Sequence, residues 1–198
     1  MALYHQLSTW IVDKYFQDEE LEAEKRAYVL YYLENILAGT EKILLVLVSA
    51  CLLSVLAETA AILLSYTVVR RKSFGWHARK SHHCTWVSLL TFVFVPWLLK
   101  EVEWNRIFLA TLCLLSVILI ARYAPADTEC NPLVDPKFRR ACRLQAIFLS
   151  IVFVFVAIAL DFYPWLIFGL FLEAVVITPV FYSIMRRSYA NYEQYQEY

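Results

Sequence analysis

Residues 144–160, LQAIFLSIVFVFVAIAL, carry no charged side chain, and only Asp161 separates them from a second apolar run at 162–185. A helix needs roughly 20 mostly apolar residues to cross the hydrocarbon core of a bilayer. Further apolar runs occupy residues 43–69, 84–99 and 107–121. This pattern predicts an all-α, polytopic helical membrane protein with five to six membrane helices.

The composition of the chain agrees with that class. Of its 198 residues, 61% are hydrophobic, whereas soluble domains average about half. The net charge is zero, so nothing in the overall charge predicts a nucleic-acid partner. The runs at 84–99 and 107–121 are short for a membrane helix, and we expect flanking residues to extend them. Aromatic residues at the run ends predict an interfacial belt: Trp86, Trp97, Trp104, Tyr123 and Trp165.

We expect one membrane domain over residues 1–198, with an amphipathic interfacial region at 1–40, membrane helices at 41–187 and a polar tail at 188–198. The first 40 residues are too charged to span, and Gly39-Thr40 is expected to mark the start of the first membrane run. The run at 43–69 is long for one span and short for two. Glu58 in its middle could mark a break, so the side of the N-terminus stays open.

Basic side chains set the expected orientation. Residues 70–80 hold five of them and no acid: Arg70, Arg71, Lys72, Arg79 and Lys80. More basic residues lie in 122–143 and at 186–187. The positive-inside rule therefore predicts a multi-pass protein of the cell membrane. Its 70–84 segment and C-terminus would be cytoplasmic, and the connectors near 100–106 and 161–164 would face outward.

Five cysteines are scattered without disulfide or metal-site spacing. We expect Cys51 and Cys113, inside apolar runs, to be buried thiols. Cys130 and Cys142 flank a basic loop and are expected to be free thiols on a reducing side of the membrane. Cys84 differs from these four because histidines and basic residues precede it closely.

The segment at 70–84, RRKSFGWHARKSHHC, places three of the four histidines beside Cys84. A cysteine nucleophile needs a nearby base or cation to hold it as thiolate. A helix beginning near Ser81 would put Cys84 in its first turn, where the helix dipole favours a thiolate. Gly75 would supply the backbone freedom to place His77. These residues predict Cys84 as a nucleophile and His77 as its base.

Two other interpretations of this segment stay open. His77, His82, His83 and Cys84 together could hold a metal ion, although adjacent histidines point to different faces of a helix. Alternatively, the segment is a basic juxtamembrane loop that contacts anionic lipid, with the histidines as bystanders.

Three motifs in the chain resemble those of one family. Residues 75–78, Gly-Trp-His-Ala, are followed by Cys84, a Tyr-Ala-Pro loop lies at 123–125, and Glu-Ala at 173–174 precedes Pro179. Together they resemble the AgrB family, the membrane endopeptidases of accessory gene regulator quorum-sensing systems. Chain length and the order of apolar runs also fit.

The resemblance implies a cysteine protease that cuts an AgrD-like precursor peptide near its C-terminus, without a cofactor or metal. It would retain the N-terminal fragment as a thioester, which passes to the peptide's own cysteine as a cyclic thiolactone. Members are thought to act as homodimers. His77 and Cys84 match the catalytic pair, and Arg70 and Gly75 match positions important to the family.

Substrate binding is expected at the basic segment around Cys84. Its candidate residues are Arg70, Arg71, Gly75 and Lys80. The planar guanidinium of Arg70 could clamp a substrate carboxylate bidentately, which a lysine cannot copy.

An alternative from another class is a small membrane transporter or proton relay that uses Glu58 and Glu173. Both acids lie within apolar runs, where an ionisable group is costly. Glu173 is about a dozen residues from the expected cytoplasmic end of its helix, which would place it roughly 18 Å deep, below the level of Cys84. A hydrogen-bonded acid that packs helices together is favoured over a catalytic one.

Overall fold

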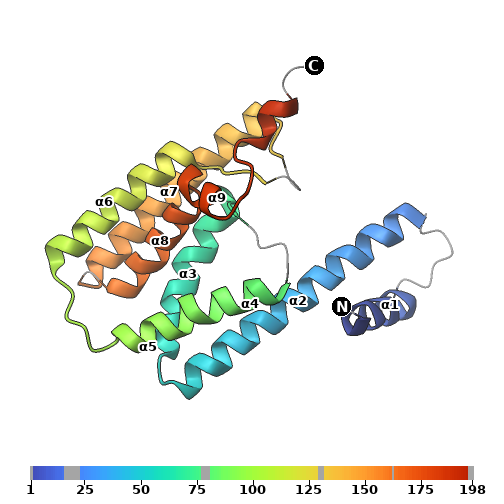
Figure 1. The fold of residues 1–198 in the computed structure, drawn as a ribbon, viewed down its shortest axis with the longest axis horizontal. Coiled ribbons are helices and arrows are strands. Elements are labelled where there is room, and N and C mark those ends of the chain that lie inside the picture. Colours follow the sequence, from blue (N-terminus) through green and yellow to red (C-terminus); the bar gives the residue numbers. More distant parts are fainter. Residues whose placement is uncertain (1, 16–22, 77–80, 129–131, 162, 196–198) are drawn as a thin grey trace. The chain divides into compact units, whose positions relative to one another are not determined.

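The computed structural model describes residues 2–15, 23–76, 81–128, 132–161 and 163–195. Within these ranges the regular secondary structure is helical (Figure 1), and an isolated bridge pairs Phe74 with Ala126. The predicted all-α class is confirmed. The chain divides into two compact units, residues 1–49 and 50–198.

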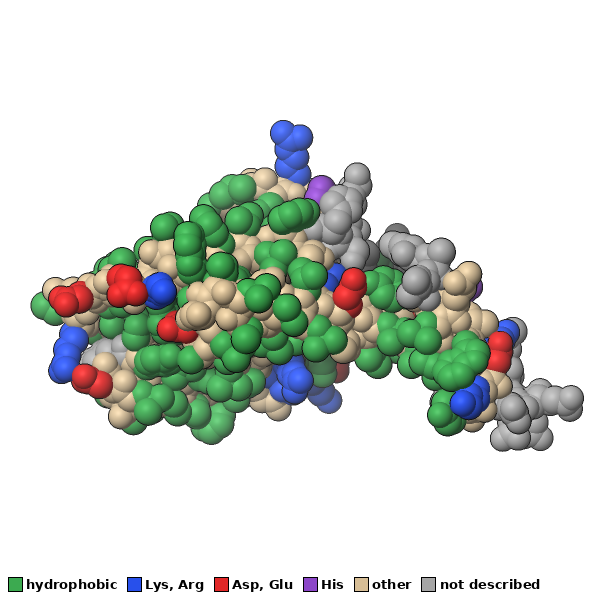
Figure 2. Space-filling model, turned by 90° about the horizontal axis from the view of Figure 1, so that it is seen from below, with side chains coloured by type: hydrophobic (Ala, Val, Ile, Leu, Met, Phe, Trp, Pro, Cys, Tyr) green, Lys and Arg blue, Asp and Glu red, His purple; other side chains and the backbone are tan. Residues whose placement is uncertain are grey.

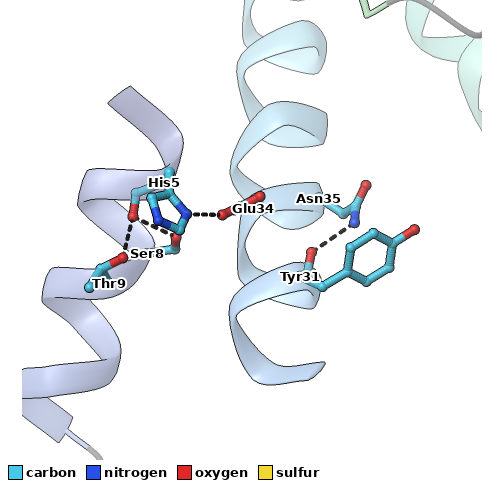
Figure 3. A network of polar contacts seen from close by, with 6 residues as sticks. All are labelled: His5, Ser8, Thr9, Tyr31, Glu34 and Asn35. Carbon is cyan, nitrogen blue, oxygen red and sulfur yellow. Dashed lines mark hydrogen bonds and ion pairs between the residues drawn. The ribbon is translucent and has the colours of Figure 1, made fainter. Parts of the chain in front are cut away.

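In the first unit, α1 (Ala2–Tyr15) lies beside α2 (Ala23–Leu52) and meets it through polar side chains. His5 Nδ1 lies 2.7 Å from Glu34 Oε1, and this contact joins the two helices in Figure 3. The hydroxyl of Tyr4 donates to Glu41, close to the same face. These contacts tie α1 to the more polar half of α2.

Gly39 and Thr40 do not interrupt α2, contrary to the sequence prediction. The hydroxyl of Thr40 donates to the carbonyl of Ile36 at 2.8 Å, one turn earlier in the same helix. The helix that contains the start of the first apolar run therefore begins at Ala23, well before that run.

The run at 43–69 is shared by two helices. α2 ends at Leu52 and α3 (Leu56–Ser73) begins four residues later. Ser54 between them has a φ of +56°, and the N–H of Val55 donates to Ala50 O at 2.9 Å. The break precedes Glu58, which lies in the first turn of α3, where the helix dipole favours an acid.

Four helices make the core of the second unit: α3, α6 (Arg106–Tyr123), α7 (Pro136–Ala159) and α8 (Pro164–Val176). α8 packs against the other three (Figure 1). Gly169 allows the close approach of α8 to α3, because a Cβ there would lie 2.2 Å from Ser65 Oγ. Burial is deepest along α8 and its partners, at Leu170, Ala174, Ile120 and Val69.

The run at 84–99 forms one helical stretch: α4 (Ser81–Leu89), a π-helical turn η1 (Leu90–Phe94) and α5 (Val95–Leu99). Pro96 has no N–H to donate to the carbonyl of Phe92 four residues earlier. The hydroxyl of Thr59 on α3 donates to that carbonyl at 2.6 Å. The irregular turn is therefore satisfied by a neighbouring helix, as a membrane environment requires.

The last apolar run is broken near its middle. α8 ends at Val176, and α9 (Pro179–Ile184) begins after Thr178, whose Oγ1 accepts the N–H of Phe181. Glu173 thus lies in the last turn of α8 rather than a dozen residues from a helix end. The expected distance of Glu173 from the end of its helix was wrong, because Thr178-Pro179 starts a new helix.

Among the described residues, three helical segments are long and apolar enough to cross a membrane: Lys25–Leu52, Arg106–Tyr123 and Pro136–Ala159. Shorter apolar helices cover His83–Leu99 and Pro164–Val176. Hydrophobic side chains spread over most of the face shown in Figure 2. These features support a membrane protein.

Candidate active site

A buried carboxylate lies where the ends of α3 and α8 meet. Glu173 has no solvent exposure. Ser73 Oγ donates to its Oε1 at 2.5 Å, and Arg70 Nη1 donates to its Oε2 at 3.1 Å. Both carboxylate oxygens therefore have partners on α3, as burial of a charged group demands.

Arg70 makes contacts on three sides. Besides Glu173, its Nη2 donates to the backbone carbonyl of Trp76. Its Cζ lies 5.3 Å from the centroid of the Tyr66 ring, within cation–π range. Only 16% of the Arg70 side chain is exposed. The carboxylate that it contacts in the structure is the chain's own Glu173.

The segment that leaves α3 turns sharply at two residues. Phe74 has a φ of +61° and Gly75 a φ of +111°, a region that L side chains rarely adopt. A Cβ on Gly75 would lie 3.1 Å from Ile177 Cγ2 and 3.3 Å from Arg70 Nη1. Glycine is therefore required here both by backbone conformation and by space.

The Tyr-Ala-Pro loop at 123–125 leads into the backbone that pairs with this segment. The N–H of Gly75 donates to Ala126 O, and the N–H of Ala126 donates to Ser73 O, each at 2.8 Å. Arg143 Nε donates to Ala124 O at 2.8 Å. Two of the motifs noted in the sequence, 50 residues apart, thus meet at one place.

The chain after α9 closes over the same loop. Asp127 is 2% exposed, and its carboxylate accepts the backbone N–H groups of Asn191 and Tyr192 at 2.9 and 2.7 Å. Tyr182 donates its hydroxyl to Asp127 O at 2.9 Å. Burial raises the pKa of Tyr189, which packs on Tyr182, to about 12. That phenol therefore stays neutral at physiological pH.

Cys84, the candidate nucleophile, lies on α4. α4 begins at Ser81, so Cys84 falls in its first turn, as the sequence predicted. Its thiol is free and half-buried. A free, partly accessible thiol at the start of a helix is a candidate nucleophile.

Two of the expected site residues, His77 and Lys80, lie outside the described residues. The structure brings Arg70 and Gly75 into contact, whereas Arg71 is exposed on the last turn of α3. The metal-site interpretation depends on His77 and on the side chain of His82, which also lies outside the description.

A sequence model of the family described as accessory gene regulator B, AgrB, matches residues 6–185. The chain belongs to the AgrB family. Members of this family take part in quorum-sensing peptide processing, and the resemblance inferred from the three motifs is confirmed.

Individual AgrB relatives match over most of the chain. An AgrB-like protein of Listeria monocytogenes serotype 4a (strain HCC23) is 32% identical over 196 residues, which cover 96% of each chain. Accessory gene regulator protein B of Staphylococcus aureus (strain JH9) is 32% identical over 142 residues, 71% of this chain and 76% of that protein. No solved structure matches.

Sequence reasoning missed several residues of this AgrB-family site. Ser73 carried no signal, because its partner Glu173 lies 100 residues away in sequence. Tyr66, one helical turn before Arg70, was not singled out either. The two N–H groups bound by Asp127 come from the segment that was expected to be a polar tail with no assigned function. The position of Glu173 near the end of a helix could have been predicted, because Thr178-Pro179 is a pairing typical of a helix start.

The cysteines of the chain divide differently from the prediction. Cys113 and Cys142 are buried, but Cys51, expected to be buried, is exposed near the end of α2. In a membrane protein an apolar run can face lipid as well as the protein interior, so apolar surroundings in sequence do not imply a packed side chain.

Proposed function

We propose that this AgrB-family chain is a membrane cysteine endopeptidase that cleaves an AgrD-like precursor peptide. Cys84 is the nucleophile, and His77 is the general base and later the acid. The observation that supports this most is the position of Cys84, a free, half-buried thiol in the first turn of α4. Reactive cysteines are commonly found at helix N-termini.

The reaction has two acyl transfers. His77 takes the proton of the Cys84 thiol, and the thiolate sulfur bonds to the scissile carbonyl carbon. The C–N bond then breaks, and the leaving amine takes the proton from His77. This leaves the N-terminal fragment on Cys84 as a thioester. The thiolate of the precursor's own cysteine next attacks that carbonyl, so a cyclic thiolactone forms and Cys84 is released as thiolate.

Other parts of the proposal follow from the placement of the site. The first turn of a helix presents backbone N–H groups that can donate to an oxyanion, so we place the oxyanion site at the start of α4. The exposed Arg71, together with Lys80, would attract an acidic peptide or anionic lipid. The enzyme is proposed to act as a homodimer from the cytoplasmic face of the cell membrane.

The test is cleavage of the precursor peptide encoded beside the gene by purified protein in lipid nanodiscs, followed by mass spectrometry. Cys84→Ser and His77→Ala should each abolish cleavage, because one removes the nucleophile and the other its base. Cys142→Ser, which changes a buried thiol elsewhere, and His83→Ala should retain most activity. Cleavage by Cys84→Ser at the wild-type rate would refute the proposal.

The ion-relay alternative loses support from the geometry. Glu58 lies in the first turn of α3. Glu173 binds Arg70 and Ser73, which lie at the other end of α3. Twelve residues of helix between positions 58 and 70 span roughly 18 Å, too far for direct proton transfer between the two acids. Alkylation of Cys84 separates the functions, since a relay through Glu58 and Glu173 would tolerate it.

A further inference from the structure

A series of polar contacts runs from the end of α8 to the residue that precedes His77. Glu173 on α8 accepts a hydrogen bond from Arg70 Nη1 at 3.1 Å. The other terminal nitrogen of the same guanidinium, Nη2, donates to the backbone carbonyl of Trp76. Arg70 therefore joins a buried carboxylate to the main chain one residue before the proposed base.

The same segment is fixed from its other side. Ser73 Oγ donates to Glu173 Oε1, the oxygen that Arg70 does not contact, at 2.5 Å. The backbone carbonyl of Ser73 accepts the N–H of Ala126. Gly75 lies against both Arg70 and Ile177 and leaves no room for a side chain. The backbone from Ser73 to Trp76 is thus held by α8, by the Tyr-Ala-Pro loop and by Arg70 together.

Stability alone does not account for a charged pair at this place. Glu173 is fully buried and Arg70 nearly so, and desolvation of two charges offsets much of their attraction. Buried ion pairs are often replaced by well-packed apolar residues with no loss of stability. A guanidinium supplies direction instead, because its planar fork aims two nitrogens at fixed angles toward two acceptors.

We propose that Glu173 and Arg70 are positioning residues for catalysis. Glu173 orients the guanidinium of Arg70, which holds the Trp76 carbonyl and so fixes the start of the segment that carries His77. This inference rests on the proposed function, since it takes His77 and Cys84 as the catalytic pair. In this proposal the Arg70 guanidinium binds acceptors within the chain, Glu173 and the Trp76 carbonyl, rather than a carboxylate of the substrate.

Steady-state cleavage by Glu173→Gln, Glu173→Leu and Arg70→Lys tests the proposal. We expect kcat to fall by roughly tenfold or more, as for other misplaced catalytic groups, with KM almost unchanged because neither residue touches the peptide. Arg70→Lys keeps the charge but cannot reach both acceptors. Glu58→Gln, which alters an acid at the opposite end of α3, should behave as wild type.

A second readout needs no peptide. The rate of Cys84 alkylation by iodoacetamide is measured against pH by peptide mapping, and the buried Cys113 and Cys142 report whether each variant stays folded. In the wild type, we expect the way in which the rate of Cys84 alkylation varies with pH to depend on His77. Glu173→Leu should give the profile of His77→Ala, and the two changes combined should add nothing further.

The outcomes distinguish the two proposals. If His77→Ala leaves the alkylation profile unchanged, the Cys84–His77 pair itself is refuted. If His77→Ala changes the profile but folded Glu173 and Arg70 variants keep both the wild-type profile and wild-type kcat, only the positioning role is refuted.

Should Glu173→Leu expose Cys113, the near-isosteric Glu173→Gln and Arg70→Lys decide the question by the same criteria. A rise in KM with kcat intact would instead assign Arg70 to substrate binding and also overturn the positioning role.

Discussion

Gly75 is a residue of the site that has little room for a side chain. Its φ of +111° and the 3.1 Å approach of Ile177 act together, and a strained backbone of this kind costs about 1–3 kcal/mol. Gly75→Ala should therefore shift the segment before His77. We expect its cleavage rate to fall by roughly tenfold or more and its Tm to drop, as measured in the nanodisc assay and by thermal unfolding.

Gly39 provides the matched control. It lies within α2, and a Cβ there would meet nothing within 4 Å. Since alanine favours a helix interior over glycine by roughly 0.5–1 kcal/mol, Gly39→Ala should keep full activity with an equal or higher Tm. Equal behaviour of the two variants would contradict the account of Gly75.

Some residues of the site could be predicted from sequence and others could not. The position of Cys84 in a first helical turn was visible, because Ser81 and the following apolar run indicate where α4 begins. The ion pair of Arg70 with Glu173 was not, because 103 residues separate the partners. A local pattern shows the charge of Arg70 but not which acceptor it meets.

At the scale of elements, the contact of α3 with α8 depends on one small residue. A Cβ on Gly169 would lie 2.2 Å from Ser65 Oγ and 2.4 Å from the carbonyl oxygen of Ile62. Gly169→Ala must therefore push the helices apart, at a cost of about 1–3 kcal/mol for overpacking. We expect a lower Tm and a lower yield of monodisperse protein by size-exclusion chromatography.

A second substitution sharpens this prediction. Ser65→Gly removes the hydroxyl but leaves the backbone of Ile62 in place, so the double variant with Gly169→Ala should recover little of the lost stability. Full recovery would show that the hydroxyl of Ser65 alone sets the helix spacing, against the geometry described above.

The boundaries of the helices were predictable only where a residue signals them. Thr178 before Pro179 marks the start of α9 by a capping side chain and a fixed φ. The break between α2 and α3 has no such signal, since Leu-Leu-Ser-Val at 52–55 contains neither glycine nor proline. Its turn depends on Ser54 at positive φ and on the hydrogen bonds from the N–H groups of Ser54 and Val55 to Cys51 O and Ala50 O.

At the scale of the whole molecule, the second unit has two distinct ends. The rings of Trp104 and Trp165 lie 6.2 Å apart at one of them, near the ion pair of Arg106 with Asp161. The other end joins residues 73–76, 123–127 and 189–192. The 18 residues of α6 separate these ends by roughly 27 Å, close to the thickness of a bilayer core.

Cysteine labelling tests the orientation that the basic residues predict. In a variant with all five cysteines replaced by serine, Glu103→Cys should react with an impermeant maleimide in intact cells, because its connector is expected outside. Glu193→Cys, equally exposed, should react only after lysis. Labelling of Glu193→Cys in intact cells would contradict the predicted orientation and would place the C-terminus outside.

The central claim is that Cys84 carries the cleaved peptide as a thioester. The most direct measurement is the intact mass of the protein after incubation with a precursor whose own cysteine is replaced by serine, so that the second transfer is slowed. The account predicts a mass increase equal to the N-terminal fragment minus one water, located on Cys84 by peptide mapping and removed by hydroxylamine. Cleavage of the precursor with no adduct on Cys84, or an adduct that persists in Cys84→Ser, would contradict it.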